Sequence, residues 1–235
     1  MTQVASDLDL DLAIDVVSFE LNGRKIKAKS SQTLIEIAKH EGIEIPHLCY
    51  KSGMESVGNC RACVVEIEGE RILAPSCCRY PSENMKVQTD SARALVSQKM
   101  VLELLQSDMP STAYTLNNEL DQWSLALSLE KPRYEPRPKV QQDATHAAIT
   151  VNLDACIQCT RCVRACRDEQ VNDVIGFAFR GVHSQVVFDM DDPMGDSTCV
   201  GCGECVQACP TGALMPAQKV GLVKADRLVD SLCPY

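Results

Sequence analysis

The amino-terminal part of the chain alternates apolar and polar residues over short runs, which is the period of a β-strand. Two such runs flank Asn22-Gly23, a dipeptide that is strongly favoured in two-residue hairpin turns. The apolar positions are Val17, Phe19 and Leu21 before the turn and Ile26 and Ala28 after it. The pattern therefore predicts a β-hairpin that starts near Val16.

A short helix is predicted after this hairpin. Ser31 is the expected N-cap, and Thr33 stands three residues before Glu36, which is the spacing of a capping box. Apolar residues at helical spacing follow at Leu34, Ile37 and Ala38.

Two further apolar runs, Val64–Ile67 and Ile72–Leu73, lie on either side of Gly69 and predict a second hairpin. Met85–Val87 is expected to form a last short strand. The predicted order is strand–strand–helix–loop–strand–strand, which is that of a β-grasp ferredoxin. We therefore expect an α+β domain over residues 16–90.

The next segment, residues 91–145, reads as a connector. Asp90 is the expected N-cap of a helix over Ser91–Gln106, in which Leu95, Leu102 and Leu105 are apolar at helical spacing. Three prolines within residues 131–138 then predict an extended linker.

The second half of the chain carries two runs of four cysteines, each spaced C-x2-C-x2-C-x3-C. Short strands are predicted before the first run at Ile149–Val151, between the runs at Val186–Phe188, and after the turn that begins at Pro210. The cysteines are Cys156, Cys159, Cys162 and Cys166 in the first run and Cys199, Cys202, Cys205 and Cys209 in the second.

This spacing is that of a bacterial-type ferredoxin domain with two [4Fe–4S] clusters, in which the fourth cysteine of each run serves the other cluster. We therefore assign two ligand sets. Cluster one takes Cys156, Cys159, Cys162 and Cys209, and cluster two takes Cys166, Cys199, Cys202 and Cys205. Zinc sites commonly use two separated pairs of ligands, and disulfides are rare where thiols are kept reduced, so both alternatives fit the doubled run poorly. The domain is expected over residues 146–225.

Four earlier cysteines, Cys49, Cys60, Cys63 and Cys77, are spaced C-x10-C-x2-C-x13-C. With the surrounding segment 58–66 they resemble the amino-terminal [2Fe–2S] domains of complex I's large peripheral iron–sulfur subunit, iron-only hydrogenases and NAD-linked formate dehydrogenases. The resemblance implies a [2Fe–2S] cluster on these four residues. Cys78 competes with Cys77 for the fourth position, and the spacing to Met85 favours Cys77.

The same families usually carry His-x3-Cys-x2-Cys-x5-Cys after the connector helix, where it binds a further [4Fe–4S] cluster. In this chain residues 107–120 contain no histidine and no cysteine. Oxygen and amide ligands replace thiolates poorly at iron–sulfur clusters. We therefore expect that additional cluster to be absent.

The composition of the chain excludes some classes of partner and indicates a cellular compartment. The chain has 235 residues, 14 cysteines and a formal charge of −9, which argues against nucleic acid or an anionic membrane as a partner. Residues 1–15 read as an acidic flexible tail without the features of a signal peptide, and no run is apolar enough for a membrane span. We expect a cytoplasmic protein. No motif for an organic substrate, NAD or flavin is present.

The resemblance extends over residues 16–235 and is strongest to the amino-terminal, electron-transferring part of the large subunit of NAD-dependent formate dehydrogenase. Residues 226–235, which end Leu232-Cys233-Pro234-Tyr235, resemble the start of the molybdopterin domain. The resemblance implies a catalytic Mo- or W-pterin subunit or domain and a flavin/NAD-binding diaphorase subunit as partners. Two alternatives stay open, the iron–sulfur subunit of an NAD-reducing hydrogenase or complex I-like enzyme, and a free multi-cluster ferredoxin.

Overall fold

The computed structural model describes residues 16–109, 118–130 and 132–219. The described residues form two compact units. The first comprises those within Met1–Ile45 and Val64–Ala94, and the second comprises those within Pro46–Cys63 and Leu95–Tyr235. The cysteine loop, residues 46–63, therefore belongs to the second unit, although the strands that precede and follow it along the chain belong to the first.

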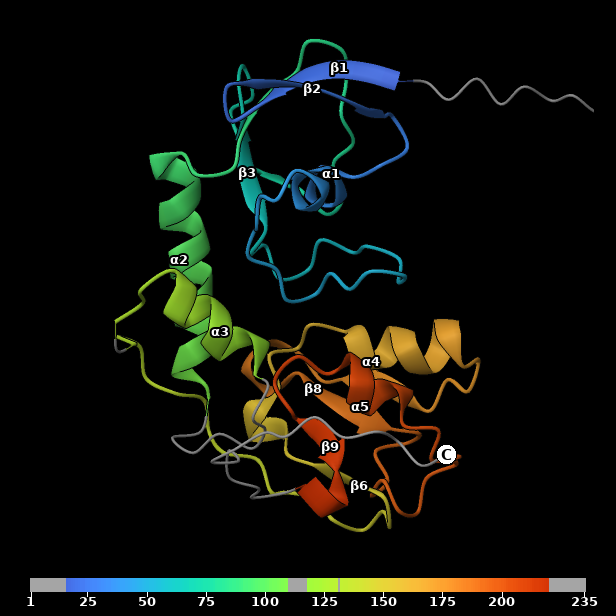
Figure 1. Cartoon of the computed structure of the whole chain (residues 1–235). Helices are drawn as coiled ribbons and strands as arrows, with labels where there is room; N and C mark the ends of the chain where they lie inside the picture. Colours follow the sequence, from blue (N-terminus) through green and yellow to red (C-terminus); the bar gives the residue numbers. More distant parts are fainter. Residues whose placement is uncertain (1–15, 110–117, 131, 220–235) are drawn as a thin grey trace, which may run out of the picture. The chain divides into compact units, whose positions relative to one another are not determined.

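The first unit is built on a five-stranded sheet with the order β2-β1-β5-β3-β4. Figure 1 labels its strands β1, β2 and β3. The pairs are antiparallel except for β1 and β5, which run parallel. The strands are β1 Val16–Leu21, β2 Arg24–Lys29, β3 Val64–Ile67, β4 Ala74–Pro75 and β5 Lys86–Gln88. This topology confirms the predicted β-grasp order.

The first predicted hairpin is confirmed. Strand β1 pairs with β2 in the register Leu21↔Arg24, which leaves a two-residue turn. Asn22 and Gly23 both have positive φ, 49° and 79°, as this tight turn requires. The buried positions Phe19, Leu21 and Ile26 form the inner face of the hairpin.

Helix α1, Leu34–His40, begins two residues later than a Ser31 cap would place it, so the prediction for Ser31 is wrong. Thr33 is the N-cap, and its backbone N–H donates to Glu36 Oε2 at 2.8 Å, the reciprocal bond of a capping box. The helix buries Leu34, Ile35, Ile37 and Ala38.

The second hairpin was predicted with the wrong second strand. The turn at Gly69 is present, with Glu70 N–H bonded to Ile67 O at 3.0 Å, but the chain pairs with β3 only at β4, Ala74–Pro75. Ile72 lies in the intervening loop and is 65% exposed. Apolar character alone misplaced the strand, because the register of β3 is also fixed by its pairing with β5 on its other edge.

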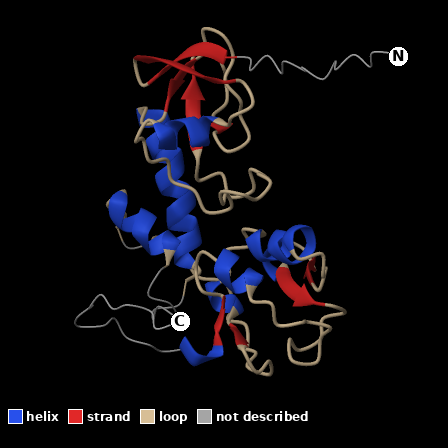
Figure 2. Ribbon diagram, turned by 45° about the vertical axis from the view of Figure 1, so that its right-hand side comes forward, coloured by secondary structure: helices blue, strands red, loops and turns tan. Residues whose placement is uncertain are grey.

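The second unit combines helices with two small sheets and long loops (Figure 2). Strand β6 (Ile149–Val151) pairs with β9 (Leu214–Pro216), and β7 (Ile175–Ala178) pairs with β8 (Gln185–Phe188), both antiparallel. The helices are α2 Ala92–Ser107, α3 Glu119–Ala126, α4 Arg161–Arg164 and α5 Glu204–Ala208. Single turns are η1 Leu153–Ala155, the π-helical η2 Ala165–Glu169, η3 Gly181–His183 and η4 Ala217–Lys219.

The expected strands β6, β8 and β9 are confirmed, whereas β7 and α3 were not predicted. The cap of α2 was placed one residue early. Ser91 Oγ, not Asp90, accepts a hydrogen bond from the backbone N–H of Ala94 at 3.2 Å. Within residues 132–138 the chain has no helix or strand, as an extended linker requires.

The second unit has two apolar clusters. One surrounds β6, β8 and β9 and includes Cys166 and Cys205. The other, here named the loop core, joins the cysteine loop to helices α2 and α3 and to the first cysteine run. Its buried members are Leu48, Cys49, Ala62, Leu102, Leu120, Ile157 and Cys159. Among the described residues, no helix combines the length and apolar character that a membrane crossing needs.

Candidate iron–sulfur sites

The four cysteines assigned to cluster one line a single cavity. Cys156, Cys159, Cys162 and Cys209 line it together with mainly apolar neighbours. Cys156 and Cys159 lie on the loop that leads into α4, Cys162 lies within α4, and Cys209 directly follows α5. The structure thus brings the last cysteine of the second run to the first three of the first run.

The four cysteines assigned to cluster two line a second cavity. Cys199, Cys202 and Cys205 come from the second run, and Cys166 reaches them from η2. The exchange of the fourth cysteine between the runs is therefore present in the geometry of both cavities. The iron-ligating role of these eight thiols stays a prediction.

The two cysteine loops use the same backbone conformation with different residues. Gly201 and Gly203 have φ of 69° and 78°. Gln158 and Thr160 occupy the matching positions of the first run, with φ of 55° and 64°. In each loop a backbone N–H donates to the first sulfur. Gln158 N lies 3.4 Å from Cys156 Sγ, and Gly201 N lies 3.4 Å from Cys199 Sγ. Such donors stabilise negative charge on sulfur.

The buried thiols are poor carriers of negative charge by themselves. Burial raises the pKa of Cys156 to about 11 and the pKa values of Cys159 and Cys205 to about 12. Burial and then the neighbouring cysteines hold the pKa of Cys162 well above its usual range. Thiolates crowded in this way require a cation, and iron is a natural partner for soft sulfur ligands. The donor sets therefore fit iron–sulfur clusters.

Across residues 16–109, 118–130 and 132–219, no three His, Cys, Asp or Glu side chains form the close group that a single ion needs. The thiols of each set are instead spread around a cavity.

Three of the four cysteines assigned to the [2Fe–2S] cluster lie in the cysteine loop. Cys49 and Cys60 face one another, because each backbone N–H lies 3.4 Å from the other residue's Sγ. The hydrogen bond with Cys49, together with burial, raises the pKa of the Cys60 thiol. Cys63 is buried at the end of the loop.

Cys77 and Cys78 belong to the first unit. Their sulfur atoms are 3.5 Å apart, but Cys77 is fully buried and Cys78 is exposed. Burial shields a cluster ligand from water, which supports Cys77 over Cys78 as the fourth ligand. That assignment also stays a prediction.

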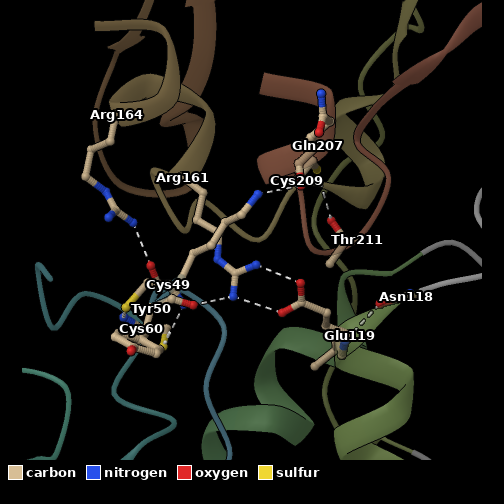
Figure 3. A network of polar contacts seen from close by, with 12 residues as sticks. Cys49, Tyr50, Cys60, Asn118, Glu119, Arg161, Arg164, Gln207, Cys209 and Thr211 are labelled. Atoms are coloured by element: carbon tan, nitrogen blue, oxygen red, sulfur yellow. Dashed lines mark hydrogen bonds and ion pairs between the residues drawn. The ribbon is translucent and has the colours of Figure 1, made fainter. Parts of the chain in front are cut away.

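Sequence reasoning missed two buried arginines, Arg161 and Arg164, inside the first cysteine run (Figure 3). Arg161 forms an ion pair with Glu119, with Nη1–Oε1 and Nη2–Oε2 distances of 2.7 and 2.9 Å, and also donates to Tyr50 O. Arg164 donates to Cys49 O at 2.6 Å and to Glu55 O. The sequence signal for them is two arginines, spaced i, i+3, that lie between predicted cluster ligands. The ligands themselves do not account for these two charges.

Helix α3 begins at the end of residues 107–120, the stretch in which the further cluster motif is missing. Asn118 caps it, since its Oδ1 accepts from Leu120 N at 2.9 Å. Glu119 N–H donates to Pro210 O at 2.8 Å, and Leu120 is fully buried in the loop core. The rest of that stretch, residues 110–117, and the Leu232–Tyr235 ending lie outside the described residues.

Two protein families match consecutive parts of the chain. Residues 15–92 match the family described as 2Fe-2S iron-sulfur cluster binding domain, and residues 155–213 match the family described as 4Fe-4S dicluster domain. The α+β fold class, with an amino-terminal 2Fe-2S ferredoxin-type domain and a carboxyl-terminal dicluster domain, is therefore confirmed.

Curated relatives are longer than this chain. NADP-reducing hydrogenase subunit HndD of Solidesulfovibrio fructosivorans is 34% identical over 234 residues, which is 92% of this chain and 40% of the relative. A protein of Staphylococcus haemolyticus named as a formate dehydrogenase is 29% identical over 86% of this chain and 21% of its own length. The chain thus spans well under half of the length of these relatives.

A solved structure also matches. The chain resembles one chain of NAD+-reducing [NiFe]-hydrogenase in the H2-reduced state with a TM-score of 0.81 and 25% identity, covering 88% of this chain and 90% of the other. Together with the two family matches, this similarity shows that the chain contains a 2Fe-2S domain and a 4Fe-4S dicluster domain and is related to proteins named as formate dehydrogenases and as NAD(P)-reducing hydrogenases.

Proposed function

We propose that the chain conducts single electrons through one [2Fe–2S] and two [4Fe–4S] clusters and has no catalytic site of its own. The observation that carries this proposal is the pair of cavities, each lined by four cysteines drawn from both runs. Cys49, Cys60, Cys63 and Cys77 would hold the [2Fe–2S] cluster, and the two sets of four would hold the [4Fe–4S] clusters.

The clusters, when bound, store and release one electron each. The protein supplies the thiolates, the backbone donors to sulfur from Gln158 and Gly201, and apolar walls that keep water from the cluster. These are the factors that set a cluster's reduction potential. The cavity of cluster one is lined by apolar residues such as Ile157 and Leu214. Few water molecules would therefore have to reorient when this cluster gains or loses an electron.

The partners are proposed to be those of an NAD-dependent formate dehydrogenase. The chain would carry electrons in the cytoplasm between a Mo- or W-pterin site that acts on formate or CO2 and a flavin/NAD site, both on partner polypeptides or domains. The similarity to proteins named as formate dehydrogenases supports this assignment, since those relatives extend far beyond the matched part.

An iron–sulfur subunit of an NAD(P)-reducing hydrogenase is the second candidate. Two observations favour it, the 34% identity to a subunit named for that activity and the coverage of 90% of a hydrogenase chain. Both candidates give this chain the same role and differ in the metal of the partner.

Affinity capture of the tagged chain from its native host under anaerobic conditions tests the assignment. Formate dehydrogenase predicts a complex that contains molybdenum or tungsten, a pterin and flavin, and that reduces NAD with formate. Nickel, or a hydrogenase iron site with hydrogen-dependent reduction of NAD(P), would replace this assignment by the second candidate. Recovery of the cluster-loaded chain alone would leave the free carrier and contradict both.

A further inference from the structure

Two buried arginines connect the cysteine loop to the first [4Fe–4S] run. We propose that Arg161 and Arg164 are positioning residues that hold this loop against the run, so that an electron passes directly between the [2Fe–2S] cluster and cluster one, and that the charge of Arg164 raises the [2Fe–2S] reduction potential. This inference rests on the proposed function, because it requires both clusters.

Arg161 is the anchor whose charge is balanced. It is only 2% exposed and lies between Cys159 and Cys162, two predicted ligands of cluster one. Its guanidinium makes a two-bond ion pair with Glu119 and also donates to the carbonyl of Tyr50, next to Cys49 (Figure 3). A planar guanidinium is suited to such a fork, since it donates in fixed directions.

Arg164 is the anchor that makes no ion pair with a carboxylate in the described part of the chain, although, after the hydrogen bond from Arg167, its charge helps to lower the pKa of the exposed Asp168 carboxyl. It is 3% exposed, and its hydrogen-bond partners among the described residues are the carbonyl oxygens of Cys49 and Glu55. Its Nε is buried and has no hydrogen-bond partner among the described residues. A buried cation that is hydrogen-bonded only to carbonyls and balanced only in part by an exposed carboxylate is costly. A neighbouring cluster with four thiolate ligands carries negative charge and offsets that cost.

Other contacts hold the cysteine loop to the two cysteine runs. Lys51 Nζ donates to Gln207 O at 2.8 Å, and Asn59 Nδ2 donates to Gln158 O at 2.8 Å, so both branches of the loop bond to the cysteine runs. The loop core places Cys49 and Cys159, predicted ligands of different clusters, in one buried apolar group. The loop and the run therefore meet across polar bonds and a dry contact.

These contacts define a short path for an electron. From Cys49 the path crosses the carbonyl–Arg164 hydrogen bond to α4, whose residue Cys162 is a ligand of cluster one. One electron leaves one centre as the other is reduced, and no bond forms or breaks. The chain lacks the usual cysteine ligands of a further cluster in residues 107–120, and α3 instead contributes Glu119 to Arg161. The direct path makes that further cluster unnecessary for this transfer.

The sign of the effect on potential follows from charge. Reduction adds a negative charge to a cluster, and a desolvated cation nearby stabilises the reduced form. Removal of the Arg164 charge should therefore lower the [2Fe–2S] potential. Arg161 should influence the potential less, because Glu119 balances its charge.

The test compares Arg164→Gln, Arg164→Lys and Arg161→Gln in the cluster-loaded full-length protein. Redox titration followed by electron paramagnetic resonance (EPR) gives the [2Fe–2S] potential, and spin–spin broadening between the two reduced centres reports their separation. Arg167→Gln is the matched control, since Arg167 is exposed on the following turn and pairs with Asp168.

We expect Arg164→Gln to lower the ratio of reduced to oxidised [2Fe–2S] at least tenfold at a fixed poise, which is a shift of about 59 mV for a one-electron couple. Arg164→Lys should keep the potential but weaken the spin–spin broadening, because lysine retains the charge without the two carbonyl bonds. Arg161→Gln should weaken the broadening, and Arg167→Gln should change neither measurement.

An unchanged potential in Arg164→Gln with all three clusters bound would overturn the inference and leave the proposed function intact. If Arg164→Gln loses its iron, the Arg164→Lys variant tests the positioning role instead. Unchanged spin–spin broadening in Arg164→Lys would contradict that role. Absence of the [2Fe–2S] or [4Fe–4S] signals from the wild-type protein would instead contradict the proposed function.

Discussion

Single residues show how two cysteine loops of different sequence reach one conformation. Gly203 and Thr160 occupy matching positions with φ of 78° and 64°. Glycine adopts this region freely, whereas threonine pays a steric cost because of its Cβ. The second run thus uses the residue that the conformation favours, and the first run carries strain that the surrounding structure maintains.

Exchanging these residues should change the stability of the two loops in opposite directions. Gly203→Thr should destabilise the protein by about 1–2 kcal/mol. A Cβ at Gly203 meets nothing within 4 Å, so the cost is conformational. Thr160→Gly should be neutral or stabilising by up to about 1 kcal/mol. Anaerobic thermal unfolding of the loaded protein measures both. Equal destabilisation by the two substitutions would contradict this account of the loops.

The raised thiol pKa values predict how iron retention depends on pH. Iron binds thiolates and must displace a proton from each thiol that would otherwise be protonated. At a thiol with the ordinary pKa of about 8.5, protons no longer compete effectively with iron above that pH. With pKa values of about 11 for Cys156 and about 12 for Cys159, protons compete with iron far above that pH.

Retention of cluster one should therefore increase continuously from pH 7 to about pH 10. Each of these thiols contributes up to about a tenfold change in affinity per pH unit. Loss of the cluster's visible absorption to a chelator, corrected for the chelator's own protonation, measures this dependence. A plateau near pH 8.5 would show that burial does not control these thiols.

Helix α3 illustrates at the level of elements how a segment without cluster ligands still supports the site. Glu119 pairs with Arg161, and Leu120 fills the loop core. The helix is only eight residues long and gains its stability from these tertiary contacts. Its contribution to the site depends on packing and not on ligands.

Truncation of Leu120 should therefore weaken the loop core. Leu120→Ala removes a fully buried side chain and should destabilise the protein by about 2–5 kcal/mol. Leu125→Ala, on the same helix but 82% exposed, is the matched control and should have almost no effect. Denaturant midpoints of the anaerobic protein measure the difference. Similar midpoints for both variants would rule out α3 as a support of the loop core.

The sequence predicted elements well where a local signal specifies them. The Asn22-Gly23 turn and the capping box at Glu36 depend on neighbouring residues, and the structure contains both. Strand β4 was misplaced because its position depends on pairing across the sheet. Helix α3 and the Arg161 network were missed because they depend on contacts between segments far apart in the sequence.

At the scale of the whole molecule, the spacing of the cysteines alone predicts the two sets of four that line the two cavities. Thiolate spacing is set by the shape of a cluster, so the pattern can be read without knowing the rest of the fold. The connection between the cysteine loop and the first run left no comparable pattern. It consists of hydrogen bonds to backbone carbonyls, such as those of Cys49 and Tyr50, which any residue type supplies.

The exchange of the fourth cysteine between the runs is testable by substitution. Cys166→Ser should perturb the same EPR signal as Cys202→Ser, and Cys209→Ser should perturb the same signal as Cys159→Ser, because each pair lines one cavity. Reduced samples of the four variants are compared with the wild-type protein. If Cys166→Ser altered the signal that Cys159→Ser removes, the ligand sets would follow the runs and not the cavities.

Combined metal analysis and EPR of the anaerobically purified chain tests the central claim most directly. The account predicts about ten irons per chain, no zinc, and three distinct signals, one from a [2Fe–2S] and two from [4Fe–4S] clusters. About fourteen irons would reveal a further cluster. A colourless protein loaded with zinc would contradict the claim that the chain carries electrons.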